Sequence, residues 1–205
     1  FGLKSGRVVH KSYIIYGLAV VILTITFFHD DTQDKLKYTS INATDMFLEE
    51  NVTYKSTKID NFSNNSLKGQ TTLVFFGYSS CPDFCPDTLA KSNQLFELLK
   101  KDNLDKKLQL LFISVDPKDN LEVIKKYVEY FNKDFIGLSM SADDMGRLAK
   151  RTGIYYKKVS STGDIDFYDH TGALFIVDDN AKIIGLYTPP LLNKDIYDDM
   201  QRILN

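Results

Sequence analysis

Two apolar runs separated by a stretch with helical spacing constrain the fold of this chain more than any other feature. The segments Thr71–Phe76 (TTLVFF) and Leu108–Val115 (LQLLFISV) are rich in β-branched and aromatic residues, as buried strands are. Between them, apolar residues from Leu89 to Leu99 recur at roughly helical intervals. Two buried strands joined by a crossover helix predict a parallel pair in an α/β sheet.

The rest of the chain continues this alternation and ends in a hairpin and a helix. The proline in Asp116-Pro117 stops the second strand because it cannot donate to a ladder. Ser141 suits the N-cap of a later helix, and Gly153 suits its end. This order predicts a thioredoxin-like α/β domain over residues 42–205. Its other expected elements are a helix at 121–131, a strand at 135–140, a helix at 141–151, hairpin strands at 173–177 and 182–187, and a helix at 193–204.

An uncharged apolar run, Tyr13–Phe28, lies near the start of the chain and follows several basic residues. As a helix it would be roughly 24 Å long, close to the thickness of a hydrocarbon core. The alternative is the core of a signal peptide, but such cores are shorter and precede small residues, whereas Phe27, Phe28 and His29 stand here. We expect a single transmembrane anchor at 13–28, with a cytoplasmic or matrix-side tail at 1–12 and a linker at 29–41.

Composition narrows the classes of partner. Charged residues make up 25% of the chain and the formal net charge is -2, with no cluster of basic and aromatic residues suited to a phosphate backbone. We therefore expect no nucleic-acid partner.

The chemistry of the chain is concentrated in the segment GYSSCPDFCP, which follows the first buried strand and holds both cysteines, Cys81 and Cys85. If they begin a helix, their spacing places both sulfurs on one face, about one turn apart. The helix dipole there favours thiolates, and Pro86 suits a first helical turn. Two adjacent thiolates can form a disulfide or bind a soft metal. A purely structural disulfide would stabilise little, because it would close a very short loop.

A metal would need a third ligand, and the chain has three histidines. His10 and His29 flank the apolar run, where a position at the membrane interface explains them. His170 directly precedes the predicted hairpin strand, at an edge of the sheet from which a loop could reach the cysteines. A set of Cys81, Cys85 and His170 would match Cu(I), and also Cu(II) if further ligands join.

Three motifs together resemble the Sco/SenC family of copper proteins: GYSSCPDFCP, SVDP at 114–117 and DHTG at 169–172. The similarity covers about residues 44–204, and one anchor ahead of the domain fits it. The resemblance implies copper on Cys81, Cys85 and His170, received from an upstream copper donor. It also implies copper transfer to, or thiol reduction of, the dinuclear copper site in subunit II of cytochrome c oxidase. The domain would then lie in the mitochondrial intermembrane space or the bacterial periplasm.

After SVDP the family commonly continues with charged residues and then a Thr-Pro, whereas this chain has Lys118-Asp119-Asn120-Leu121. This difference puts the start of the next helix in doubt. Asp116 and Asp169 lie near the site by motif, although turn or capping roles explain them equally well.

Other functions remain open at this point. We expect a metallochaperone rather than an enzyme, but Cys81 and Cys85 could also be the redox pair of a membrane-anchored thiol-disulfide oxidoreductase. General oxidoreductases usually have two residues between their cysteines, and this chain has three. A peroxidase would need a single low-pKa cysteine beside an activating group, for which the sequence gives no specific sign. A copper-dependent redox sensor would look the same in sequence as a chaperone.

Overall fold

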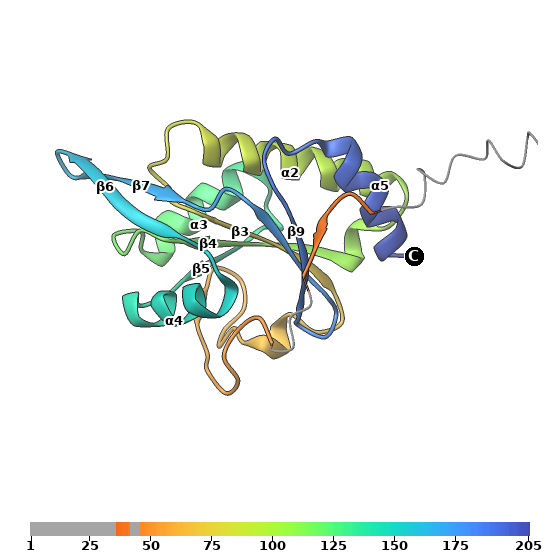
Figure 1. The fold of residues 1–205 in the computed structure, drawn as a ribbon, viewed down its shortest axis with the longest axis horizontal. Coiled ribbons are helices and arrows are strands. Elements are labelled where there is room, and N and C mark those ends of the chain that lie inside the picture. Colours follow the sequence, from red (N-terminus) through yellow and green to blue (C-terminus); the bar gives the residue numbers. More distant parts are fainter. Residues whose placement is uncertain (1–35, 42–45) are drawn as a thin grey trace, which may run out of the picture. The chain divides into compact units, whose positions relative to one another are not determined.

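The computed structural model describes residues 36–41 and 46–205, and a seven-stranded mixed sheet forms its framework (Figure 1). The strand order is β1-β9-β8-β3-β4-β5-β2. The central strands β3 (Thr71–Gly77), β4 (Leu108–Ser114) and β5 (Ile136–Ser139) run parallel. The parallel pair predicted from the two apolar runs is thus confirmed.

The remaining strands are antiparallel to their neighbours. On one side of β3 lie β8 (Leu174–Val177) and β9 (Ile183–Tyr187), which form the predicted hairpin. The short edge strands are β1 (Thr39–Ser40), paired with β9, and β2 (Lys55–Ser56), paired with β5. Residues 39–40, within the expected linker 29–41, therefore belong to the sheet.

Helices cover both faces of this sheet. The helices α2 (Phe84–Lys101), α3 (Leu121–Phe131) and α5 (Asn193–Ile203) lie on one side, and α4 (Ala142–Thr152) lies on the other (Figure 1). The crossovers from β3 to β4 and from β4 to β5 run in the same direction across the sheet, so they place α2 and α3 on the same face. After β5 the chain reverses its direction across the sheet, and α4 lies on the opposite face. The fold class expected from the sequence, a mixed α/β fold of thioredoxin type, is confirmed.

Local chemistry explains the helix ends. The Ser141 side chain caps α4 by accepting a hydrogen bond from the Asp144 N–H at 3.1 Å, and Gly153 ends this helix with a φ of 75°. The start of α3, in doubt from the sequence, is at Leu121, where the Asn120 side chain accepts from the Val123 N–H at 3.0 Å. Asn120 thus caps α3 at the position where the sequence departs from the family pattern.

A second hairpin, β6 (Tyr156–Thr162) with β7 (Ile165–His170), projects beyond the large sheet (Figure 1). It forms a separate two-stranded sheet. The sequence does not predict this hairpin, because β6 is exposed from Lys157 onward and lacks the apolar alternation of a half-buried strand.

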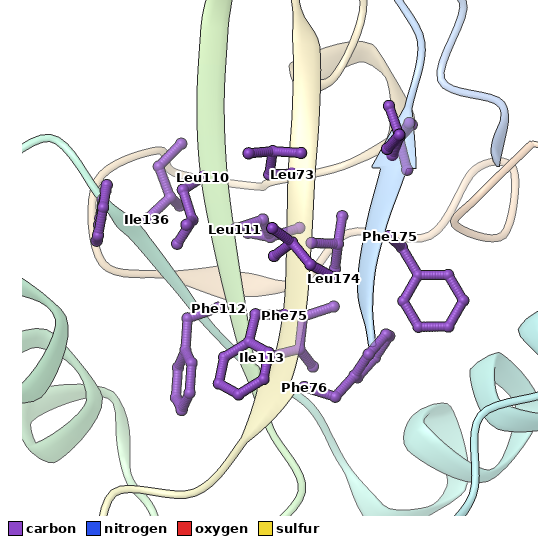
Figure 2. Packing of buried hydrophobic residues seen from close by; sticks show 14 of the residues in the cluster. Leu73, Phe75, Phe76, Leu110, Leu111, Phe112, Ile113, Ile136, Leu174 and Phe175 are labelled. Carbon is purple, nitrogen blue, oxygen red and sulfur yellow. The ribbon is translucent and has the colours of Figure 1, made fainter. Parts of the chain in front are cut away.

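The core lies on both sides of β3, β4 and β8, whose side chains are nearly all inaccessible to solvent. Figure 2 shows the aromatic side chains Phe75, Phe76, Phe112 and Phe175 packed across these strands. This buried centre ends at Gly77, where the cysteine segment begins.

The predicted tail at 1–12 and anchor at 13–28 lie outside the described residues. Within residues 36–41 and 46–205, no helix is both long enough and apolar enough to span a bilayer.

Candidate metal centre

The two cysteines lie on either side of the start of α2, close to the arrangement considered from the sequence. Cys85 is the second residue of the helix and is fully buried, whereas the half-buried Cys81 lies in the preceding turn. The Cys85 N–H donates a hydrogen bond to the Cys81 sulfur at 3.3 Å. The side chain of Asp83, the N-cap residue, accepts no capping bond. The Cys81 sulfur therefore accepts one of the free N–H groups of the helix start, which favours its thiolate.

Gly77 makes room for the Cys85 sulfur. A Cβ atom on Gly77 would lie 3.0 Å from the Cys85 Sγ and 2.9 Å from the Phe112 ring. Both distances are below normal van der Waals contact. The end of β3 can pass this close to the sulfur only because this residue has no side chain.

His170 is the last residue of β7 and points toward the cysteines. Its Nε2 lies 3.6 Å from the Cys85 Sγ, and its Nδ1 lies 3.2 Å from the Thr171 carbonyl oxygen. Because a carbonyl oxygen can only accept, the Nδ1 contact places the ring proton on Nδ1. The lone pair of Nε2 is then directed toward the sulfur atoms, as a metal ligand requires.

Three aromatic rings hold the imidazole in place. The ring centroid of His170 lies 6.2 Å from that of Phe75, 5.9 Å from that of Tyr78 and 6.2 Å from that of Phe84. Phe75 comes from β3, Tyr78 from the cysteine turn and Phe84 from α2. These rings were not predicted as part of the site, although all three lie within ten residues of a cysteine.

The structure brings Cys81, Cys85 and His170 together. One ligand atom from each lies within 4.8 Å of the other two, and in residues 36–41 and 46–205 this is the one group of three or more such side chains that could hold a metal ion. Two soft sulfurs and an imidazole nitrogen fit Cu(I). His10 and His29 lie outside the described residues.

The two thiols have opposite acidities. A hydrogen bond from the Cys85 thiol is the main cause that lowers the pKa of Cys81 to about 4, against the effect of burial, and backbone N–H groups of the helix start add to it. The same hydrogen bond, together with burial, raises the pKa of Cys85. At neutral pH the metal-free pair therefore holds one thiolate, on Cys81, and one proton, on Cys85.

A buried carboxylate behind the cysteine turn was not predicted as part of the site. Asp119 accepts hydrogen bonds from the Ser79 N–H at 2.8 Å and from the Ser114 hydroxyl at 2.6 Å. The sequence signal was present, since Asp119 follows a strand that ends beside β3. Asp116 takes the turn role considered from the sequence, accepting from the Lys118 N–H at 2.8 Å, and Asp169 is exposed.

Comparison with known proteins assigns the family. The profile of the SCO1/SenC family matches residues 49–205. This chain belongs to the SCO1/SenC family. Its membership confirms the resemblance drawn from the cysteine, SVDP and DHTG motifs.

Among Sco relatives, the SCO2-like protein of Rickettsia felis is 33% identical over 126 residues, covering 60% of each chain. The mitochondrial SCO2 homologue of Bos taurus is 30% identical over 137 residues, covering 66% of this chain and 52% of its own. The chain thus matches between about half and three fifths of the length of these two relatives.

Solved Sco structures share the fold. The structure of ScoI from Bradyrhizobium japonicum, described with copper bound, is 28% identical and has a TM-score of 0.67, covering 75% of this chain and 97% of its own. The apo Sco1 protein of Thermus thermophilus is 27% identical and has a TM-score of 0.70, covering 83% and 98%.

Proposed function

We propose that this Sco protein is a copper carrier that holds the ion through Cys81, Cys85 and His170. The observation that carries the proposal is the convergence of two sulfurs and one imidazole nitrogen within 4.8 Å. Copper is here the cargo, held by ligands that a partner can replace one at a time. The copper-bound description of the Bradyrhizobium japonicum relative supports the choice of metal.

The different pKa values of the two thiols indicate the order in which they would bind the ion. Cys81 is already a thiolate at neutral pH, so it can bind the incoming ion first. Cys85 must lose its proton as the second sulfur binds, and copper uptake therefore releases about one proton per ion. His170 would bind through Nε2, because its Nδ1 faces the Thr171 carbonyl oxygen.

The proposed recipient is the dinuclear copper site in subunit II of cytochrome c oxidase, with an upstream copper donor loading the carrier. This follows from the family resemblance, and the mitochondrial names of relatives agree with it. Residues 13–28 would anchor the chain in the membrane, with the copper domain in the mitochondrial intermembrane space or the bacterial periplasm.

Competition titration with a chromophoric Cu(I) chelator, performed anaerobically on the reduced full chain in detergent, tests the carrier role. We expect one ion per chain, and a large loss of affinity in His170→Ala and in Cys81→Ser. His29→Ala is the matched control and should bind like wild type. Equal affinity in wild type and His170→Ala would contradict the proposal.

A second candidate function is thiol-disulfide reduction, which the unequal acidity of the cysteines favours. The Cys81 thiolate would attack one sulfur of a partner disulfide, breaking the S–S bond and releasing a partner thiolate. Cys85, once deprotonated, would attack the Cys81 sulfur and release the second partner thiolate. The partner is thereby reduced by two electrons, and Cys81 and Cys85 end as a disulfide.

The two functions differ in their need for His170. Reduction of an oxidised copper-site peptide of subunit II should persist in His170→Ala at a rate within a few-fold of wild type, but be lost in Cys81→Ser. If the Cys81→Ser variant reduces the peptide as wild type does, the reductase role is excluded.

A further inference from the structure

The ligands of the centre come from two segments that share no backbone ladder. The cysteines follow β3 of the large sheet, whereas His170 ends the separate β6–β7 sheet. The distance from His170 to the sulfurs therefore depends on the short connection from His170 to β8, which pairs with β3, and on side-chain links between the hairpin and the rest of the domain. Several of these links come from one connection, residues 115–120 between β4 and α3, which we call the bracket loop.

On the cysteine side, the link is Asp119. Its carboxylate is buried and accepts from the N–H of Ser79 at 2.8 Å, from the Ser79 hydroxyl and from the Ser114 hydroxyl at 2.6 Å. Ser79 lies two residues before Cys81, and Ser114 ends β4. Asp119 therefore fixes the start of the cysteine turn to the end of the neighbouring strand.

On the histidine side, the links are Asp116 and Lys118. The Tyr168 hydroxyl donates to Asp116 Oδ1 at 3.2 Å. The Lys118 ammonium lies 3.0 Å from Asp166 Oδ2 and donates to the Asp164 carbonyl oxygen at 3.0 Å. Both links reach β7 or the turn before it, and Tyr168 is two residues from His170.

The Lys118 link ends on a buried carboxylate. Asp166 is 4% exposed. A Lys158 ammonium 2.7 Å away is the first cause that holds the pKa of Asp166 below its usual range, and Lys118 adds to it. Lys158 lies on β6, so the hairpin keeps an internal partner for Asp166 if Lys118 is removed. Loss of Lys118 should therefore loosen the hairpin from the loop without unfolding it.

We propose that the bracket loop sets the position of His170 relative to Cys81 and Cys85, with Lys118 and Asp119 as positioning residues of the metal centre. The proposal rests on the proposed function only in so far as the centre binds copper. Neither residue donates an atom to the ion. Lys118 acts through the hairpin that carries His170, and Asp119 acts through the turn that carries the cysteines.

The histidine side is tested with Lys118→Met in the full chain, with Lys118→Arg as the conservative rescue. The matched control is Lys126→Met, which removes an exposed ion pair with Glu122 on α3. One readout needs no metal: nuclear Overhauser contacts between the His170 ring and the rings of Phe75 and Phe84. The other is Cu(I) affinity by competition titration.

We expect Lys118→Met to weaken these ring contacts and to lower copper affinity by up to about 10-fold, because groups bonded directly to metal ligands contribute about 10-fold or more and Lys118 acts through the hairpin. Lys118→Arg should restore both, and Lys126→Met should leave both unchanged. Unchanged ring contacts and affinity in Lys118→Met would overturn the histidine side of the proposal.

The cysteine side is tested with Asp119→Asn, which keeps the size of the side chain but turns an acceptor into a donor. Asp178→Asn is the matched control, because Asp178 accepts the N–H groups of Asn180 and Lys182 in a turn at the other end of β8. We expect faster amide hydrogen exchange at Ser79 and lower copper affinity in Asp119→Asn alone. Equal effects of the two substitutions on copper affinity would show that Asp119 stabilises the fold in general and does not position the cysteine turn, which would overturn this part of the proposal.

Failure of the copper proposal is distinguishable from failure of this one. If the wild-type chain binds no copper, the proposed function is wrong, while the ring contacts and the Ser79 exchange still decide whether the bracket loop positions the two segments. If Asp119→Asn does not fold, Ser79→Ala removes one of the three bonds and takes its place in the exchange and titration comparison.

Discussion

At the residue scale, the two cysteines have different roles because their surroundings differ. Cys81 receives a backbone N–H and a thiol hydrogen bond and is half exposed, whereas Cys85 is enclosed by the core and by its contact with Gly77. Spacing alone predicted that the sulfurs would be close. The difference in acidity could not be predicted, because it depends on which thiol donates and which is buried.

This acidity predicts an unusual pH profile for alkylation of the reduced, metal-free chain. With a pKa of about 4, Cys81 remains a thiolate from pH 6 to pH 8, so its iodoacetamide rate should be nearly constant there and fall only as pH approaches 4. An ordinary cysteine, with a pKa of about 8.5, should speed up by nearly two orders of magnitude over the same interval. Mass spectrometry of the labelled peptide measures the rate.

Cys85→Ser provides the control for this profile. The hydrogen bond from the Cys85 thiol is the main cause of the low pKa, and a weaker or differently placed donor should move the alkylation curve of Cys81 to higher pH. A wild-type rate that rises through pH 8 like that of free cysteine would show that Cys81 is not a thiolate in the fold.

Gly77→Ala should disturb the centre through packing alone. The added methyl would lie 3.0 Å from the Cys85 sulfur, so we expect a loss of stability of about 1–3 kcal/mol and weaker copper binding. Urea denaturation and Cu(I) titration measure the two effects. Gly146→Ala is the control, since a Cβ there meets nothing within 4 Å and alanine favours the surrounding helix.

At the scale of elements, sequence patterns predicted those parts of the fold that bury an apolar face. The helix at 121–131 has its predicted bounds, and β3, β4, β8 and β9 differ from prediction by one residue at an end. The β6–β7 hairpin was missed because its stability comes from Asp166, Lys158 and its own ladder rather than from an apolar stripe. Charge pairs of this kind leave no periodic signal in a sequence.

Helix α5 holds the first described residues of the domain through a single carboxylate. Asp199 is 1% exposed and accepts from the N–H groups of Lys37 at 2.7 Å and Tyr38 at 3.1 Å and from the Tyr187 hydroxyl at 3.1 Å. Asp199→Ala would leave these donors unpaired, and we expect a loss of about 3 kcal/mol in the free energy of unfolding.

The adjacent Asp198 gives a matched control for this prediction. It is more exposed and pairs with Lys194 one turn earlier, so Asp198→Ala should change stability by less than about 0.5 kcal/mol in the same urea titration. Similar losses in both variants would show that the buried hydrogen bonds of Asp199 contribute no more to stability than the exposed ion pair of Asp198.

At the scale of the whole molecule, the thiolate should couple stability to pH. In the folded, reduced chain Cys81 loses its proton near pH 4, whereas in the unfolded chain it does so near the ordinary value of about 8.5. Between these values the unfolded state holds one more proton at this site, so the contribution of Cys81 to stability increases with pH and is lost as pH falls toward 4.

The comparison with Cys81→Ser isolates this contribution from that of other titrating groups. The stability difference between the reduced wild type and this variant, measured by urea denaturation at several pH values, should grow in favour of wild type from pH 5 to pH 8. A difference that does not change with pH would exclude the coupling.

The three proposed ligand residues could be predicted from the sequence because they stand in motifs next to strand ends. What it could not predict was how the histidine segment is held against the cysteines. That arrangement depends on Lys118, Asp119 and the rings around His170, which lie close together only after the bracket loop and the hairpin have folded against each other.

The most direct test of this account is X-ray absorption at the copper edge on the full chain loaded with one equivalent of Cu(I) under anaerobic conditions. We predict a first shell of two sulfurs and one imidazole nitrogen, with the nitrogen signal absent from His170→Ala and retained in His29→Ala. A wild-type spectrum with two sulfurs alone, identical to that of His170→Ala, would contradict the three-ligand centre.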